Sequence, residues 1–481
     1  MQSSIIILVI ILYFFGLFVI SSLTTGNNDN TTFFSANKES PWYLVAFGMV
    51  GASLSGITFI SVPGDVGSTQ FTYFQVVLGY LFGYFVVALL LLPIYYKLNL
   101  TSIYEYLKVR FGTISHKTGA FFFFVSRITG ASFRLYLVAI VLQQFVFNEL
   151  NIPFEITVVI SVSLIWIYTF RGGIKTIVWT DTLQTTFMLI SVLLSIYLIS
   201  KSLDWSFTDF INSDELKSYS KVFVTESLLE KNHFYKSFIG GMFITICMTG
   251  LDQDMMQKNL TCRNLKDAQK NMFWFTIVLT IVNLIFLGLG LLLTIYAEQN
   301  GIDAHKDTLF STIAMNDNFG WGIGVFFLLG LIAAAYSSAD SALTSLTTSF
   351  SIDILDIEKK HTPEDQIKVR KKVHIAMSLV LILVIVSFNY LIGDASVITK
   401  LFVFTGYTYG PLLGLYAFGL FSKQKIKDRF VPIIAILTPF VGYAISYFSS
   451  LWFGFEFGFF ILILNGLLTY LGLVLIRTQQ N

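Results

Sequence analysis

A dense run of small hydroxyl side chains occupies the segment AAAYSSADSALTSLTTSF. At helical spacing, Ala334, Ser337, Ser338 and Ser341 fall at i, i+3, i+4 and i+7, so they share one face, and Asp340 lies beside that face. Hydroxyl and carboxylate oxygens are hard donors of the kind that alkali and alkaline-earth cations prefer. Small hydroxyl residues in a membrane helix also bond to their own carbonyls or permit close packing. The stripe alone therefore leaves a Na⁺ site and a packing surface both open.

Charged side chains inside apolar stretches form a second group. Arg127 and Arg134 lie about two turns apart, and Asp181 follows the apolar start of another stretch. An ionisable residue at membrane depth is costly and usually faces a cavity or a partner. The arginines could simply pair with Asp252 or Asp340, and Asp181 could simply be a favourable charge at a helix N-terminus. The planar fork of an arginine also suits a carboxylate ligand, which favours an organic anion near Arg134.

Glycine-rich interruptions mark two of the apolar stretches that must position these residues. The first reads GMVGASLSGITFISVPGDVGSTQ, and the second has Gly240 and Gly241 near its start and TGLDQDMMQK around Gly250. Irregular backbone at membrane depth is tolerated only where protein or a water-filled cavity receives its polar groups. Two interrupted helices in corresponding places of two halves indicate the central binding site of a transporter, although such glycines can also serve close helix packing.

Composition defines the class of the protein. Of the 481 residues, 55% are hydrophobic and 12% charged, about half the charged fraction of a soluble domain. Apolar stretches near 20 residues recur along the chain, so we predict an all-α polytopic membrane protein. A net charge of +2 without a basic cluster argues against nucleic-acid binding. The two cysteines have no metal-binding spacing, no phosphate-binding GxxxxGK[ST] loop occurs, and no histidine stands in a catalytic spacing, so we expect neither an enzyme nor an organic cofactor.

Hydropathy and helix breakers predict thirteen spans. They lie near 4–23, 43–71, 74–96, 118–148, 156–170, 178–200, 236–257, 271–295, 320–352, 373–391, 396–421, 430–448 and 456–476. With the N-terminus outside, the inner segments hold 22 lysines and arginines, Lys258 among them, and the outer segments hold 6. This asymmetry predicts an N-out, C-in topology. The first stretch lacks a basic start and a good cleavage site, so we expect a retained helix.

Four segments together resemble the sodium/solute symporter family, which includes bacterial proline, galactose and sialic acid transporters and animal sodium–glucose and sodium–monocarboxylate carriers. They are TSIYEYLKVRFG (101–112), GGIKTIVWTDTLQ (172–184), DQDMMQKNL (252–260) and AAAYSSADSALTS (333–345). The resemblance implies a LeuT-type fold of two inverted five-helix repeats. Its parts would be an N-terminal extra helix and inner loop (1–42), the first repeat (43–200), an outer loop (201–235), the second repeat (236–421) and two C-terminal helices (422–481).

The resemblance also implies a main sodium site. Its ligands would be the carbonyls of Gly51, Leu54 and Ala334 and the hydroxyls of Ser337 and Ser338. Family members often carry alanine at the position of Gly51, and because a carbonyl binds the ion, we expect that change to be tolerated. Na⁺ would be the coupling ion, with no further cofactor.

A second cation site is implied for some members of the family. Its residues here would be Asp181, Ser337, Asp340 and Ser341. The best-matched pattern has a hydroxyl in place of Asp340. This carboxylate could strengthen the site, pair with an arginine or carry a proton, so the number of Na⁺ per cycle stays open.

The organic substrate would lie near the middle of the bilayer. The candidate residues are Ser55, Thr58, Gln75, Arg134, Asp252, Gln253, Thr405 and Tyr407, with Tyr409 nearby. We expect Na⁺-coupled uptake of a small organic anion, similar to a sialic acid or a monocarboxylate, by a multi-pass protein of the bacterial inner membrane. A Na⁺-coupled sugar or inositol-type polyol symporter is the alternative, and a passive channel or a transporter-like sensor lies outside that class. The expected partners are the solute, Na⁺ and the lipid bilayer, with no obligate protein partner.

Overall fold

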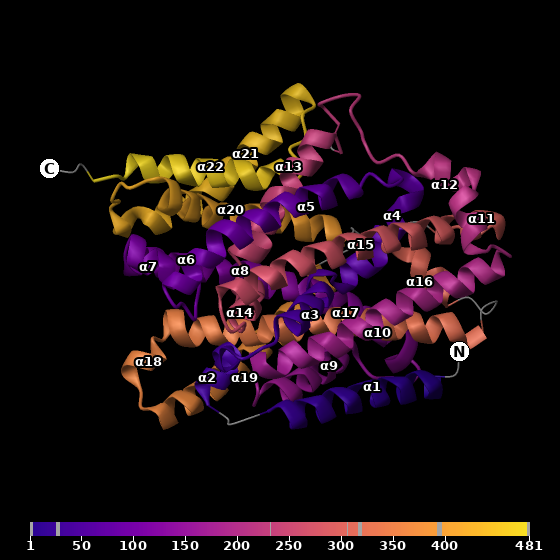
Figure 1. The fold of residues 1–481 in the computed structure, drawn as a ribbon, viewed down its shortest axis with the longest axis horizontal. Coiled ribbons are helices and arrows are strands. Elements are labelled where there is room, and N and C mark those ends of the chain that lie inside the picture. Colours follow the sequence, from indigo (N-terminus) through magenta and orange to yellow (C-terminus); the bar gives the residue numbers. More distant parts are fainter. Residues whose placement is uncertain are drawn as a thin grey trace.

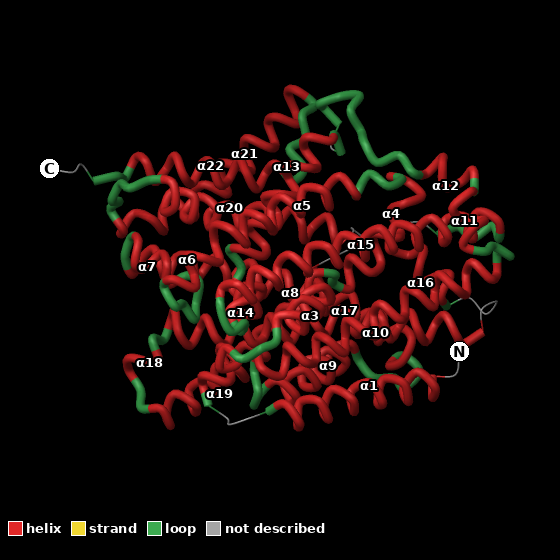
Figure 2. Tube along the Cα trace, viewed as in Figure 1, coloured by secondary structure: helices red, strands yellow, loops and turns green. Residues whose placement is uncertain are grey.

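The computed structural model describes residues 3–25, 29–230, 232–304, 306–315, 320–391 and 397–478. These residues form helices and loops (Figure 2), with two isolated β-bridges that join Ser40 to Cys262 and Ile426 to Arg477. The main helices are α1 (Ser3–Thr24), α3 (Trp42–Ser53), α4 (Gly56–Thr69), α5 (Phe74–Val86), α8 (Thr113–Leu142), α9 (Phe154–Thr169), α10 (Ile174–Ser202), α13 (Phe234–Thr245), α14 (Gln253–Leu260), α15 (Leu265–Gln299), α17 (Gly320–Ser349), α19 (Pro363–Leu391), α20 (Val397–Phe421), α21 (Val431–Phe453) and α22 (Phe460–Leu475).

Shorter elements connect the main helices. The short α-helices are α2 (Asn30–Ser35), α6 (Leu92–Lys97), α7 (Glu105–Arg110), α11 (Phe207–Asn212), α12 (Asp214–Tyr219), α16 (Leu309–Ala314) and α18 (Ile357–Lys360). The π-helical turns η2 (Val87–Leu91), η3 (Gln143–Phe147), η4 (Ile246–Gly250) and η7 (Phe350–Ile354) extend α5, α8, α13 and α17. The 3₁₀ turns are η1 (Ala36–Lys38), η5 (Lys306–Thr308) and η8 (Asp428–Phe430).

Membrane-crossing helices dominate the described part of the chain. Eight helices are long and apolar enough to span a bilayer, or up to ten if each of two bent helix pairs is counted as one span. The predicted polytopic all-helical membrane protein is therefore confirmed. Most of the long helices lie roughly along one axis of the molecule (Figure 1). In that view α1 begins at the end that carries α11, α12 and α16, and α22 ends at the opposite end, beside α7.

The serine-rich helix α17 lies at the centre of the bundle. In its apolar window 83% of the residues are buried, against 22% in α1 and 22% in α21, which run along opposite edges of the molecule in Figure 1. The outer helices expose large apolar side chains such as Leu12 and Phe15 of α1 and Phe440 of α21, as helices in contact with lipid do. Because alanine and serine are small, neighbouring backbones can approach α17 closely.

Both predicted helix interruptions are present. Helix α3 ends at Ser53, Leu54 leaves helical geometry with ψ of 75°, and Ser55 caps the N-terminus of α4. The axis bends by 57° there and by 63° between the helix that ends at Gly250 and α14. The side chain of Asp252 caps α14 by accepting hydrogen bonds from two backbone N–H groups. Each break leaves helix-end carbonyls without intrahelical partners at the centre of the protein.

Several helices begin outside the predicted spans: α15 begins at Leu265 rather than near 271, and α19 at Pro363 rather than near 373. One further difference bears on the site. Lys258 was assigned to an inner loop, but the second half of the broken helix continues as α14 to Leu260. Lys258 is therefore inside the protein, with only 1% of its surface exposed.

Candidate functional site

Close packing between α3 and α10 fixes the position of the first break. A Cβ atom added to Gly48 would lie 2.9 Å from the Cβ of Asp181, and one added to Gly51 would overlap the hydroxyl of Thr185. The N–H of Gly51 instead donates a hydrogen bond of 3.1 Å to the Thr185 hydroxyl. Thr185 thus occupies the space that a methyl group at Gly51 would need, so glycine is the residue that fits this contact.

The serine stripe of α17 meets the first break directly. The hydroxyl of Ser338 lies 3.2 Å from the carbonyl oxygen of Ala52 and 3.3 Å from that of Ala334, close enough to donate to either. The five residues expected to form the main sodium site, Gly51, Leu54, Ala334, Ser337 and Ser338, are all buried and lie on these two elements. A serine hydroxyl that donates its proton keeps lone pairs for a cation, so this arrangement of carbonyls and hydroxyls suits Na⁺.

The residues expected at a second cation site are also gathered on α10 and α17. Ser337 donates to Oδ1 of Asp181 at 2.6 Å, while Oδ2 of Asp181 lies 2.7 Å from the ammonium of Lys258. Asp340 accepts a hydrogen bond of 2.9 Å from the Tyr168 hydroxyl and another from the backbone N–H of Ser341. An ammonium group of the protein thus stands beside the carboxylate for which a sodium ion was expected.

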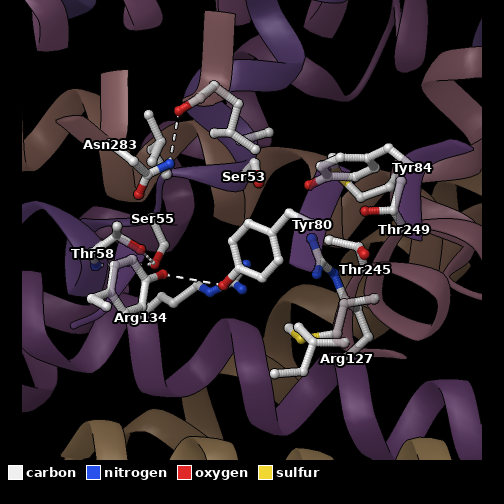
Figure 3. Close-up of a pocket in the computed structure, with 17 residues that line it drawn as sticks. Ser53, Ser55, Thr58, Tyr80, Tyr84, Arg127, Arg134, Thr245, Thr249 and Asn283 are labelled. Carbon is white, nitrogen blue, oxygen red and sulfur yellow. Dashed lines mark hydrogen bonds between the residues drawn. The ribbon is translucent and has the colours of Figure 1, made fainter. Parts of the chain in front are cut away.

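A polar cavity opens beside the first break. It offers about 90 Å³ to the centres of water molecules. Ser55, Thr58 and Arg134, three of the predicted substrate residues, line it and are drawn together in Figure 3. The other lining residues are Ala52, Ser53, Leu54, Tyr73, Tyr80, Tyr84, Arg127, Ile244, Thr245, Met248, Thr249, Met255, Leu279 and Asn283.

The two arginines of α8 have different surroundings. Arg127 forms an ion pair with Asp254 and lies 3.9 Å from Asp252, which also accepts a hydrogen bond from Tyr409. Arg134 is only 8% exposed, and within the described ranges no acid lies within ion-pair distance of its guanidinium. Asp254 and Asp252 both lie beside Arg127, and Arg134 brings to the cavity wall a guanidinium without an ion-pair partner among the described residues.

The remaining predicted substrate residues lie elsewhere. Gln75 donates to the carbonyls of Thr72 and Asn232, and Gln253 holds the segment before α7 through Thr101 and Ile103. The ring of Tyr407 packs against Tyr443 of α21. Thr405 is buried in α20, and neither it nor Asp252 lines the cavity.

Sequence patterns could have predicted several of the other residues that line the cavity. Tyr73, Tyr80 and Tyr84 recur at i, i+7 and i+11, which places them on one face along the length of α5, with Tyr73 as its N-cap. The hydroxyls of Tyr73 and Tyr80 lie 3.1 Å apart. Asn283 is a lone amide in an otherwise apolar stretch of α15, and such a residue commonly marks a functional position.

A second buried polar cluster lies away from the cavity. Nε2 of His116 is 2.7 Å from Oδ1 of Asp353, and Ser102 and Ser349 donate to Oδ2 at 2.7 and 2.5 Å. No spacing in the sequence predicts this cluster, because its members come from distant segments. Within the described ranges, no group of three or more His, Cys, Asp or Glu side chains is placed to hold a metal ion.

Comparison with known proteins decides the family. The model of the sodium:solute symporter family matches residues 33–427. The chain belongs to the sodium:solute symporter family. It is accordingly a transporter and not an enzyme, and Na⁺ is the coupling ion of its family.

Individual relatives agree with this assignment. The chain is 25% identical over 438 residues to the sodium/sialic acid symporter SiaT of Proteus mirabilis, covering 86% of this chain and 85% of the relative. It is 24% identical over 404 residues to the sodium/sialic acid symporter NanT of Aliivibrio fischeri, covering 82% and 78%. The structure of a Na⁺-coupled sialic acid symporter in a substrate-bound outward-open state superimposes with a TM-score of 0.81 over 99% of both chains, at 21% identity. The chain described here therefore has the fold of that sialic acid symporter.

Proposed function

We propose that this symporter couples the entry of Na⁺ to the uptake of a small organic anion that carries a carboxylate. The observation that supports this most directly is the buried Arg134, which lines the cavity together with Ser55 and Thr58 and lacks an acidic ion-pair partner among the described residues. A buried guanidinium without an ion-pair partner is unfavourable, and a bidentate carboxylate would supply that partner. A neutral sugar or polyol would leave this charge unpaired, which disfavours the alternative substrate class.

The names of the relatives narrow the substrate further. Two relatives matched over most of their length are named as sodium/sialic acid symporters, and a mouse relative matched over 46% of its length is named as a sodium-coupled monocarboxylate transporter. Both substrate classes carry one carboxylate. We therefore take N-acetylneuraminic acid as the first probe and a monocarboxylate as the second.

The main sodium site provides the coupling. Na⁺ bound by the carbonyls of Gly51, Leu54 and Ala334 and the hydroxyls of Ser337 and Ser338 would hold the broken α3–α4 helix against α17. Because Ser55 and Thr58 of the same broken helix line the cavity, an ion that fixes the break also fixes the substrate pocket. An ion that binds one conformation more tightly shifts the population toward it, and this is how one ligand favours the binding of the other.

The proposal includes thirteen membrane spans with the N-terminus outside and the C-terminus inside a bacterial inner membrane, arranged as inverted repeats over 43–200 and 236–421. Two observations support it. The asymmetry of lysine and arginine favours this orientation. The start of α1 and the end of α22 at opposite ends of the molecule agree with an odd number of crossings.

Uptake by the purified protein in proteoliposomes tests the proposal. Labelled N-acetylneuraminic acid or lactate should accumulate with an inward NaCl gradient and not with choline chloride, whereas glucose and inositol should not accumulate. Replacing Arg134 with alanine removes a charge-assisted pair that contributes about 3 kcal/mol, so the apparent affinity for the anion should fall about 100-fold.

Two matched variants control this experiment. Arg134→Lys keeps the charge but loses the bidentate fork, so we expect an intermediate loss. Arg171→Ala removes an exposed arginine outside the cavity and should transport as the unmodified protein does. Full anion uptake by Arg134→Ala, or uptake that does not depend on Na⁺, would contradict the proposed function.

A further inference from the structure

The ammonium of Lys258 lies beside the carboxylate of Asp181, at the place where a second sodium ion was expected. The two charged atoms are 2.7 Å apart, and the two side chains are 2% and 1% exposed. The other oxygen of Asp181 accepts the hydrogen bond from Ser337. Both oxygens of this carboxylate are therefore engaged by the protein itself.

Neighbouring contacts hold Lys258 in this position. On one side, the amide of Gln257 donates to the carbonyl of Phe34 at 2.8 Å and to the hydroxyl of Thr348 at 2.9 Å. On the other side, the side chain of Asn259 accepts a hydrogen bond of 2.7 Å from Asn271. A lysine between two anchored neighbours on a short helix has little freedom to withdraw from Asp181.

The charge of Asp181 is already compensated at this point. One ammonium already compensates the single charge of Asp181, and a sodium ion would need the same oxygen. A second cation in contact with the first would add like-charge repulsion in a buried environment. Asp340, the other acid expected there, has its oxygens engaged by Tyr168 and by the backbone N–H of Ser341.

We propose that Lys258 is a built-in cation that replaces the second sodium ion, so that the protein binds and couples one Na⁺ per cycle, at the main site. This inference rests on the proposed function, since it presumes that Na⁺ drives uptake. It assigns Lys258 a positioning role: the ammonium holds Asp181, and Asp181 in turn orients Ser337 of the main sodium site.

Equilibrium binding of ²²Na⁺ to the purified full-length protein tests the number of sites without requiring a known substrate. We expect one saturable Na⁺ per chain and a Hill coefficient of 1. Two Na⁺ per chain would overturn this inference while leaving Na⁺-coupled transport intact. A chain that binds no Na⁺ would contradict the proposed function, and this inference with it.

Two variants test whether Lys258 is what limits the protein to one bound Na⁺ per chain. Lys258→Met keeps the length of the side chain but leaves Asp181 without a counter-cation, so two Na⁺ per chain are expected. Asp181→Asn combined with Lys258→Met removes both charges and should bind one. A single Na⁺ in Lys258→Met would overturn the assignment. Should Lys258→Met fail to fold even in high NaCl, the count in the unmodified protein and in the charge-free double variant still decides the question, because two sites in either would overturn the inference.

Discussion

A methyl group added at Gly51 should weaken the binding of Na⁺ without touching a sodium ligand atom. The backbone carbonyl of Gly51 is the expected ligand, and alanine has the same carbonyl. The added Cβ would overlap the hydroxyl of Thr185 and would lie 3.2 and 3.3 Å from the Cβ and Cα atoms of that residue. Because Cα belongs to the backbone of α10, rotation of the threonine side chain cannot relieve every contact, and α3 must shift away from α10.

The size of the effect follows from these contacts. Overpacking by one methyl group in a buried position costs about 1–3 kcal/mol. Lengthening of the hydrogen bond from the Gly51 N–H to Thr185 adds about 1 kcal/mol, and the better helix propensity of alanine returns up to about 1 kcal/mol. A net cost of about 1–3 kcal/mol, borne by the arrangement in which the carbonyl faces the ion, raises the half-saturating Na⁺ concentration about 5- to 150-fold.

Thermal unfolding of the purified protein across a NaCl series, with choline chloride at constant ionic strength, measures that concentration. Gly51→Ala combined with Thr185→Ala removes the overlapping hydroxyl and should recover most of the loss. Gly16→Ala is the matched control, because the nearest atom to its added Cβ is 3.8 Å away. Unchanged Na⁺ dependence in Gly51→Ala, or a double variant no better than the single one, would refute the reasoning.

Two further predictions concern the breaks. Ser338→Ala removes the hydroxyl that contacts Ala52 of the broken helix and should raise the half-saturating Na⁺ concentration about 10-fold. Ser345→Ala loses only a hydrogen bond to its own helix and should leave that concentration unchanged. Equal effects of the two variants would show that α17 is sensitive to the loss of any hydroxyl. Asp252→Ala should lower the melting temperature more than Asp252→Asn, because asparagine preserves the N-cap of α14, which contributes about 1 kcal/mol. The reverse order in a thermal melt would mean that the charge beside Arg127 matters more than the cap.

Both helix breaks could be predicted because each depends on residues close together in the sequence. Glycines and a following serine or aspartate specify the end of one helix and the cap of the next. The face shared by Ser337 and Ser338 was equally predictable, because helical periodicity places residues i+3 and i+4 on the face of residue i without knowledge of any neighbour.

Contacts between distant segments could not be predicted in the same way. Tyr407 and Tyr409 are two residues apart, and the rotation of α20 decides that Tyr409 meets Asp252 while Tyr407 meets the C-terminal helix α21. Either arginine of α8 could have paired with Asp252, and only the position of Asp252 at the start of α14 in the folded chain selects Arg127. The proximity of Lys258 to Asp181 likewise depends on how far the second broken helix continues, which hydropathy does not specify for a buried polar helix.

The ion pair of Lys258 and Asp181 has an electrical consequence. One Na⁺ that crosses with one monovalent anion moves no net charge, so the membrane potential, which acts with about 2.3 kcal/mol per charge at 100 mV, does no work on the overall cycle. The steady accumulation of solute would then be limited to the Na⁺ concentration ratio across the membrane, and a second coupled Na⁺ would square that ratio and add the voltage. With Lys258 in place of a second Na⁺, the protein would reach a lower ratio of inside to outside solute concentration, and its uptake would not depend on the membrane potential.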